Sequence, residues 1–223
     1  MEATARGNKP KTLQNIAYIS IPDSADLEFL LWDLQDAIAA YARLSGTSLP
    51  RPVNLGTDDN DGTADTADGI VLAVEDAPND EALAAIEQAL DHFSGMGTRV
   101  YVVVQADVGG PERARGLVER LRTACDLRDL LWCGGVIICA GSGIEALCRS
   151  PRMGLLRRPF SEAMDKLVGA VRMGCSVEHA QRLGGGNADD VTDDSTVCAE
   201  PAVPAQIWQG VLKRLGSRAQ SNN

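Results

Sequence analysis

Positive charge is scarce in this sequence. Its 223 residues include 21 Lys and Arg against 31 Asp and Glu, so the formal net charge is −10. Because nucleic acids are bound through basic surfaces that neutralise phosphates, this balance argues against a nucleic-acid partner. Long apolar runs are also missing: residues 1–14 contain no apolar core of a secretory signal, and the runs elsewhere are far too short to span a bilayer. We therefore expect a cytoplasmic protein that does not bind membranes.

The residues of metal centres and nucleophilic triads are equally sparse. The six cysteines form no CxxC pair, and Cys133 and Cys139 fall in an apolar run where cysteine acts as a small hydrophobe. The two histidines, His92 and His179, have no Ser or Cys partner at a recognisable spacing. A G-x-G-x-x-G turn and a Walker A loop are absent as well, which argues against a dinucleotide-binding Rossmann domain. We expect no metal site and assign no catalytic residue.

The sequence does contain apolar segments separated by stretches of helical length. Three of them are near-continuous runs rich in Val and Ile, without the alternation of a half-exposed sheet. This pattern is typical of strands that helices cover on both faces. The three runs are residues 69–75, 99–105 and 131–140. Two weaker strands are predicted at residues 16–21 and, at an edge of the sheet, at residues 52–55.

Five strands that alternate with helices predict an α/β three-layer sandwich with a five-stranded parallel sheet. We favour the flavodoxin-like strand order 2-1-3-4-5, because no strands remain to build the second half of a Rossmann sheet. The domain is expected to span residues 14–175, after a flexible leader at residues 1–13. An acidic Gly-rich loop at residues 176–203 and a C-terminal helix and tail at residues 204–223 are expected to follow.

The polar stretch at residues 56–68 stands where such a fold has its second crossover helix. Part of it suggests a calcium loop. When Gly62 is placed at the sixth position of such a loop, however, two key ligands and the flanking helices are missing. We favour a solvated acidic loop.

Open α/β sheets bind ligands at the carboxyl ends of their strands, so the loops after the strands form the candidate site. After the first strand, the hydroxyls of Ser20 and Ser24 are suited to hold a phosphate at a helix N-terminus; alternatively, Ser24 only caps that helix. After the fourth strand, Gly109 and Gly110 let the backbone approach a flat ring, or form a turn that needs positive φ.

The loop after the third strand is acidic, and it ends in residues that can cap the next helix. A phosphoryl-accepting receiver domain has the same strand order and would use acids such as Asp23 and Asp76. It also needs a lysine after the last strand, where this chain has Gly141-Ser-Gly-Ile. The receiver interpretation is therefore disfavoured.

Arginines gather between residues 149 and 158 of this acidic chain. Guanidinium groups pair with phosphates in a bidentate fashion, so Arg152, Arg157 and Arg158 are a possible nucleotide clamp. The alternative is that they pair with carboxylates of the protein itself.

Residues 68–174 resemble the flavodoxin-like superfamily, in particular the NADPH-dependent FMN reductases and the multimeric flavodoxins. The resemblance is carried by the segment Ala67-Asp-Gly-Ile-Val-Leu-Ala, the Gly109-Gly110 turn, the Gly134-Gly135-Val strand, and Leu156-Arg-Arg with Glu162 and Leu167. It implies an FMN that accepts a hydride from NAD(P)H and is held by the loops after strands 1, 3 and 4. In this sequence those cofactor-binding positions are Ser20, Pro22, Asp23, Ser24, Glu75, Asp76, Ala77, Ala106, Asp107, Gly109 and Gly110.

Two interpretations of function stay open at this point. The first is an FMN-binding oxidoreductase or electron-transfer protein that uses NADPH. The second is a flavodoxin-like protein without a cofactor that acts as an interaction or assembly module. In both, we expect a small-molecule site at the carboxyl edge of the sheet. The C-terminal helix either covers the core of its own sheet or contacts a neighbour in a homodimer, and its position far past the last domain helix suggests the dimer.

Overall fold

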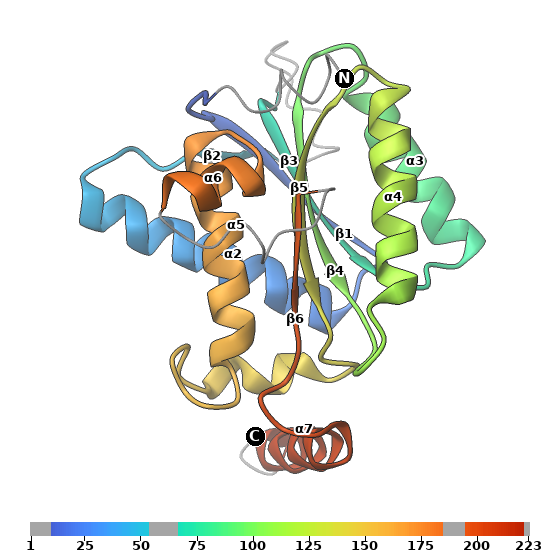
Figure 1. The fold of residues 1–223 in the computed structure, drawn as a ribbon, viewed down its shortest axis with the longest axis vertical. Helices are drawn as coiled ribbons and strands as arrows, with labels where there is room; N and C mark the ends of the chain where they lie inside the picture. Colours follow the sequence, from blue (N-terminus) through green and yellow to red (C-terminus); the bar gives the residue numbers. More distant parts are fainter. Residues whose placement is uncertain (1–9, 54–66, 185–194, 221–223) are drawn as a thin grey trace.

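The computed structural model describes residues 10–53, 67–184 and 195–220. In these residues the chain forms one parallel sheet between two layers of helices, which confirms the predicted α/β sandwich (Figure 1). The sheet has six strands in the order β2-β1-β3-β4-β5-β6. The strands are β1 (Asn15–Ile21), β2 (Arg51–Val53), β3 (Gly69–Glu75), β4 (Arg99–Gln105), β5 (Leu131–Ile138) and β6 (Thr196–Ala199).

The helices divide between the two faces of the sheet (Figure 1). One face is covered by α2 (Ala25–Ser45), α5 (Arg158–Met173) and α6 (Val177–Leu183), and the other by α3 (Asp80–His92) and α4 (Glu112–Asp126). Beyond the carboxyl edge of the sheet, α7 (Ala205–Gln220) contacts the 3-10 helix η1 (Ile144–Arg149). None of the helices in the described ranges has the length and apolar character needed to cross a membrane.

The prediction of five strands is wrong, because β6 adds a sixth parallel strand beside β5. The strand lies within residues 176–203, where the sequence predicts a loop. A segment of four residues is too short to show a recognisable strand pattern in the sequence, and it forms a strand through its pairing with β5. The helix α6 lies in the same stretch.

Two adjacent glycines allow β5 to have close neighbours on both sides. Gly134 has φ +90°, and a Cβ atom there would lie 2.0 Å from the carbonyl oxygen of Ser195. A Cβ atom on Gly135 would lie 2.1 Å from the carbonyl oxygen of Val102, next to a register shift between β4 and β5. The absence of side chains at both positions therefore allows the irregular register between β4 and β5 and the close approach of the neighbouring strands.

Several local predictions are confirmed. The three buried runs are the central strands β3, β4 and β5, and the weak strand with Pro52 is the edge strand β2. Ser24 caps α2 by accepting a hydrogen bond from the backbone N–H of Leu27, and the Asn79 side chain caps α3 in the same way. Leu13, in the segment that the sequence assigns to a flexible leader, is 3% exposed and belongs to the core.

Some predictions concern residues outside the described ranges. These are the first nine residues of the leader, nearly all of the polar stretch at 56–68 with its calcium-loop alternative, and residues 185–194 of the acidic loop.

Candidate functional site

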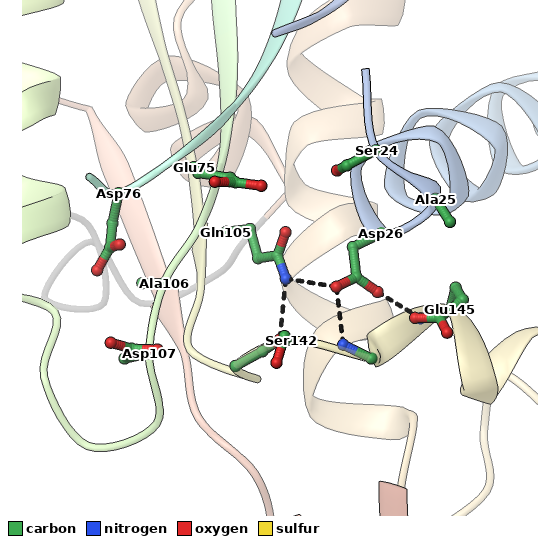
Figure 2. A pocket seen from close by; sticks show the side chains of 12 residues that line it. Ser24, Ala25, Asp26, Glu75, Asp76, Gln105, Ala106, Asp107, Ser142 and Glu145 are labelled. Atoms are coloured by element: carbon green, nitrogen blue, oxygen red, sulfur yellow. Dashed lines mark hydrogen bonds between the residues drawn. The ribbon is translucent and has the colours of Figure 1, made fainter. Parts of the chain in front are cut away.

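A cavity of about 370 Å³ opens at the carboxyl edge of the sheet. It lies where the chain, having placed β2 on one side of β1, crosses over to place β3 on the other. Open α/β sheets bind ligands at such switch points. The lining residues, shown in Figure 2, are Ser24, Ala25, Asp26, Glu75, Asp76, Gln105, Ala106, Asp107, Gly141, Ser142, Gly143 and Glu145.

Asp26, in the first turn of α2, holds three parts of the pocket together (Figure 2). Its Oδ2 atom accepts hydrogen bonds from the backbone N–H of Gly143 at 2.7 Å and from Nε2 of Gln105 at 2.9 Å. Its Oδ1 atom accepts one from the backbone N–H of Glu145 at 3.0 Å. This one carboxylate therefore joins α2, the end of β4 and the loop that leads from β5 into η1.

The carboxyl group of Glu145 keeps its proton more tightly than an ordinary glutamate. Its pKa is raised to about 7, first by a hydrogen bond with the Asp26 carboxylate, then by partial burial and by the negative charge of Asp26. The pKa of Asp26 is lowered despite its burial, because hydrogen bonds from Glu145, Gly143 and Gln105 stabilise its charged form. The two acids therefore share one proton, carried by Glu145 and donated to Asp26.

This proton predicts how stability depends on pH. The folded state keeps it up to about pH 7, whereas an unfolded glutamate loses it near pH 4.5, so its stabilising contribution is present below about pH 4.5 and lost as the pH rises through 7. We expect the Glu145→Gln variant, whose neutral amide can still donate to Asp26, to lose this part of the pH dependence. The measurement is urea unfolding of both proteins at about pH 5 and pH 8.

The variant should gain stability relative to the natural protein as the pH rises between these two values. Because both proteins contain the same remaining acids and histidines, their difference isolates Glu145. A difference in free energy of unfolding that stays constant with pH would contradict the shared proton.

Gln105, the last residue of β4, is 7% exposed and has a fixed amide orientation. Its Nε2 donates to Asp26 and, at 2.9 Å, to the carbonyl oxygen of Gly141. Both partners are acceptors, so the amide nitrogen must lie on their side and the oxygen on the other. That Oε1 atom is buried and accepts no hydrogen bond from the described residues.

The structure brings together part of the predicted cofactor-binding set. Ser24, Glu75, Asp76, Ala106 and Asp107 line the pocket. The predicted residues outside the lining are Ser20, Pro22, Asp23, Ala77, Gly109 and Gly110. The pocket therefore includes the three strand ends of the prediction. After β3 and β4 its residues lie closer to the strands than predicted, and after β1 they lie farther along the chain, in the first turn of α2.

The predicted arginine clamp is not at the pocket. Arg152 and Arg157 both form ion pairs with the buried carboxylate of Asp33. Arg158 pairs with Glu162 one turn along α5, on the surface. All three guanidinium groups therefore pair with carboxylates of the protein itself, as the alternative interpretation expects, and none of them lines the cavity.

Sequence reasoning missed the loop after β5 as part of the site. Gly141, Ser142, Gly143 and Glu145 come from this loop and the start of η1. The available signal was a Gly-Ser-Gly turn directly after a buried strand, a position that borders the ligand cleft in open sheets. Gln105 gave a second signal, because a polar residue that ends a fully buried strand faces the same edge.

The chemistry of the lining does not fit FMN. Five of the twelve lining residues are acids, and neither an aromatic side chain nor a lysine or arginine is among them. The N-terminus of α2, where a phosphate would bind, is already capped by Ser24 and carries Asp26 and Glu28 in its first turn. Within the described residues, no group of three or more acids, cysteines or histidines is arranged to hold a metal ion.

No protein-family model matches this chain, and no curated protein is detectably similar to it. The fold and the site define an open α/β protein with an acidic pocket at the carboxyl edge of a parallel sheet.

Proposed function

We propose that this chain is a flavodoxin-like protein that binds a small-molecule ligand at the carboxyl edge of its sheet without holding FMN. The single observation that carries the proposal is the acidic lining of the cavity at that edge. The strand order of the first five strands agrees with a flavodoxin-like sheet, whereas the pocket lacks the chemistry of a flavin site.

The electrostatics of the pocket support this proposal over the FMN-dependent oxidoreductase that the resemblance implies. A phosphate monoester carries nearly two negative charges at neutral pH, and it would enter a pocket that contains Asp26, Glu75, Asp76 and Asp107. Arg113 is a cation at the rim, but it already contacts Asp76 and Asp107. Oxidoreductase activity with NAD(P)H stays a prediction that the same experiment tests.

The test is a flavin titration of the purified protein. We expect the protein to be colourless, to retain no FMN after incubation and desalting, and to leave FMN fluorescence unquenched. Riboflavin is the matched control, because it has the same ring system without the phosphate. NADPH oxidation in the presence of added FMN should not exceed the rate without protein.

Retention of one FMN per chain, with its visible absorbance band, would overturn the proposal and favour the oxidoreductase. Binding of riboflavin but not of FMN would support it, because the acids would then reject the phosphate, as the electrostatic argument expects.

A further inference from the structure

The pocket contains two buried acceptor atoms that accept no hydrogen bond from the described residues. One is Oε1 of Gln105, whose orientation is set by the two acceptors that hold Nε2. The other is Oδ2 of Asp76, a side chain that is 10% exposed. The Asp76 atom has an ion-pair contact with Arg113 at 3.6 Å but no hydrogen bond, whereas the Gln105 oxygen has neither kind of partner among the described residues. A buried acceptor without a donor is costly, so the Gln105 oxygen indicates that a donor group belongs at this wall.

The positions of these acceptors define one side of the pocket. Figure 2 shows the Gln105 oxygen pointing away from Asp26 and toward the side where Glu75 lies. Glu75 and Asp76 are consecutive residues at the end of β3, and the register pairs Glu75 with Gln105 on β4. The end of this strand pair therefore carries two carboxylates and a carbonyl oxygen, all of them acceptors.

The charge of the pocket favours a cation as the donor. Its lining has five acids, and the proton shared by Asp26 and Glu145 neutralises only one of them. Arg113 contacts Asp107 at 2.5 Å and Asp76 at 3.6 Å, yet its side chain is 59% exposed and belongs to the rim. A negative excess therefore remains, and its field is screened less in a concave site than on an open surface.

The kind of cation follows from the same residues. A metal ion needs several oxygen ligands converging at about 2.0–2.6 Å, and no group of three or more acids, cysteines or histidines in the described part of the chain is arranged in that way. An ammonium or guanidinium group instead donates several separate hydrogen bonds to acceptors spread over a wall. A cavity of about 370 Å³ accommodates such a group with a short alkyl chain.

We propose that this pocket binds an organic cation through its alkylammonium or guanidinium group, with Gln105 Oε1 and the carboxylates of Glu75 and Asp76 as the acceptors. This inference rests on the proposed function, because it names the ligand class of the same site. The carrier of the group is either a free small molecule or the side chain of a peptide.

Calorimetric titration with three probes tests the proposal. They are putrescine, methylguanidine and a blocked Gly-Arg-Gly peptide. The neutral controls are butane-1,4-diol and methylurea, which match the first two probes in shape but carry no charge. We expect at least one cation to bind with a Kd below about 1 mM and the neutral controls not to bind. Raising NaCl from about 0.1 M to about 0.5 M should weaken binding severalfold.

Three variants locate the binding. Glu75→Gln removes one charge at the proposed acceptor wall and should weaken binding about tenfold, since charge-assisted hydrogen bonds are among the strong ones. Arg113→Ala removes the competing cation and should strengthen binding severalfold. Glu87→Gln makes the same charge change at an exposed position of α3 outside the pocket and should leave binding unchanged.

Each outcome supports or overturns the proposal. Tighter binding of the peptide than of methylguanidine supports a protein side chain as the carrier, and the reverse supports a free small molecule. Failure of all three probes at about 10 mM, equal binding of the neutral controls, or displacement of the probes by equimolar Mg²⁺ would overturn it. A colourless protein with no cation response would refute this inference alone, whereas tight FMN binding would refute the proposed function.

Discussion

Replacing Asp33 by alanine should lower the free energy of unfolding by about 3–5 kcal/mol, as for other buried charges that lose their partner. Asp33 is 4% exposed on α2 and accepts hydrogen bonds from Arg152 and from Arg157, which is 5% exposed. The Arg157 guanidinium also lies over the Phe29 ring, 5.1 Å from its centroid. Without Asp33, a buried cation would remain on an apolar surface with no neutralising charge at that point.

Urea unfolding followed by circular dichroism measures this effect. Asp33→Asn keeps the volume and part of the hydrogen bonding, so it separates loss of charge from loss of packing, and it should cost less than Asp33→Ala. Arg158→Ala is the matched control, because Arg158 pairs with Glu162 on the surface, and the substitution should have no measurable effect. Equal stability of Asp33→Ala and Arg158→Ala would show that the ion pairs of Asp33 with Arg152 and Arg157 do not stabilise the fold.

The same variants decide what the arginine loop does. The sequence suggests a nucleotide clamp, for which Arg157→Ala should weaken NADPH binding. The geometry predicts instead that Arg157→Ala destabilises the fold, because Arg157 links the loop before α5 to α2 through Asp33 and to the carbonyl oxygen of Ser150. A stable Arg157→Ala protein with weakened NADPH binding would favour the nucleotide-clamp interpretation instead.

Replacing Trp208 by alanine should cost a similar amount, about 3–5 kcal/mol. Trp208 is fully buried although α7 lies beyond the edge of the sheet. Its Nε1–H donates to the carbonyl oxygen of Ala140 at 2.7 Å, and its ring packs 5.5 Å from that of Phe160. The substitution leaves both a large cavity and a buried carbonyl oxygen without its donor.

Ile207 provides the control for this prediction. It is the neighbouring residue on α7 and is 57% exposed, so Ile207→Ala should change the free energy of unfolding only slightly. Trp208→Phe should fall between the two, because it keeps most of the packing and loses the hydrogen bond. If Trp208→Ala and Ile207→Ala behaved alike, α7 would not be part of the folded core.

The link through Ala140 also connects α7 to the pocket. Ala140 directly precedes Gly141, whose carbonyl oxygen holds the Gln105 amide. Detachment of α7 in Trp208→Ala is therefore expected to loosen the loop after β5 as well as to destabilise the core.

Local patterns predicted much of this fold because the physical causes are local. A central strand of a parallel sheet is buried on both faces, so the runs at β3, β4 and β5 are apolar along their whole length and visible in the sequence. The caps Ser24 and Asn79 each satisfy a backbone N–H three residues away. The strand β6 escaped prediction because its cause is distant: it forms by pairing with β5, about 60 residues earlier in the chain.

The candidate site likewise has a part that local patterns predicted and a part that depends on distant contacts. The ends of β1, β3 and β4 were predictable as its border, since the carboxyl ends of parallel strands meet at one edge. The hydrogen bonds that shape it were not. Asp26 meets Gly143 and Glu145 across more than 100 residues, and neither the raised pKa of Glu145 nor the open acceptor of Gln105 has any signature in neighbouring residues.

By itself, therefore, the sequence determined the class of fold, the central strands and the edge of the sheet where the cavity lies, because hydrophobic burial and helix capping act between residues a few positions apart. Tertiary structure alone decided that Arg152 and Arg157 bind Asp33, that a sixth strand extends the sheet beside β5, and that acids from the ends of four strands share one cavity. These features depend on which distant residues meet, and the free energy of each contact exists only once the sheet has brought them together.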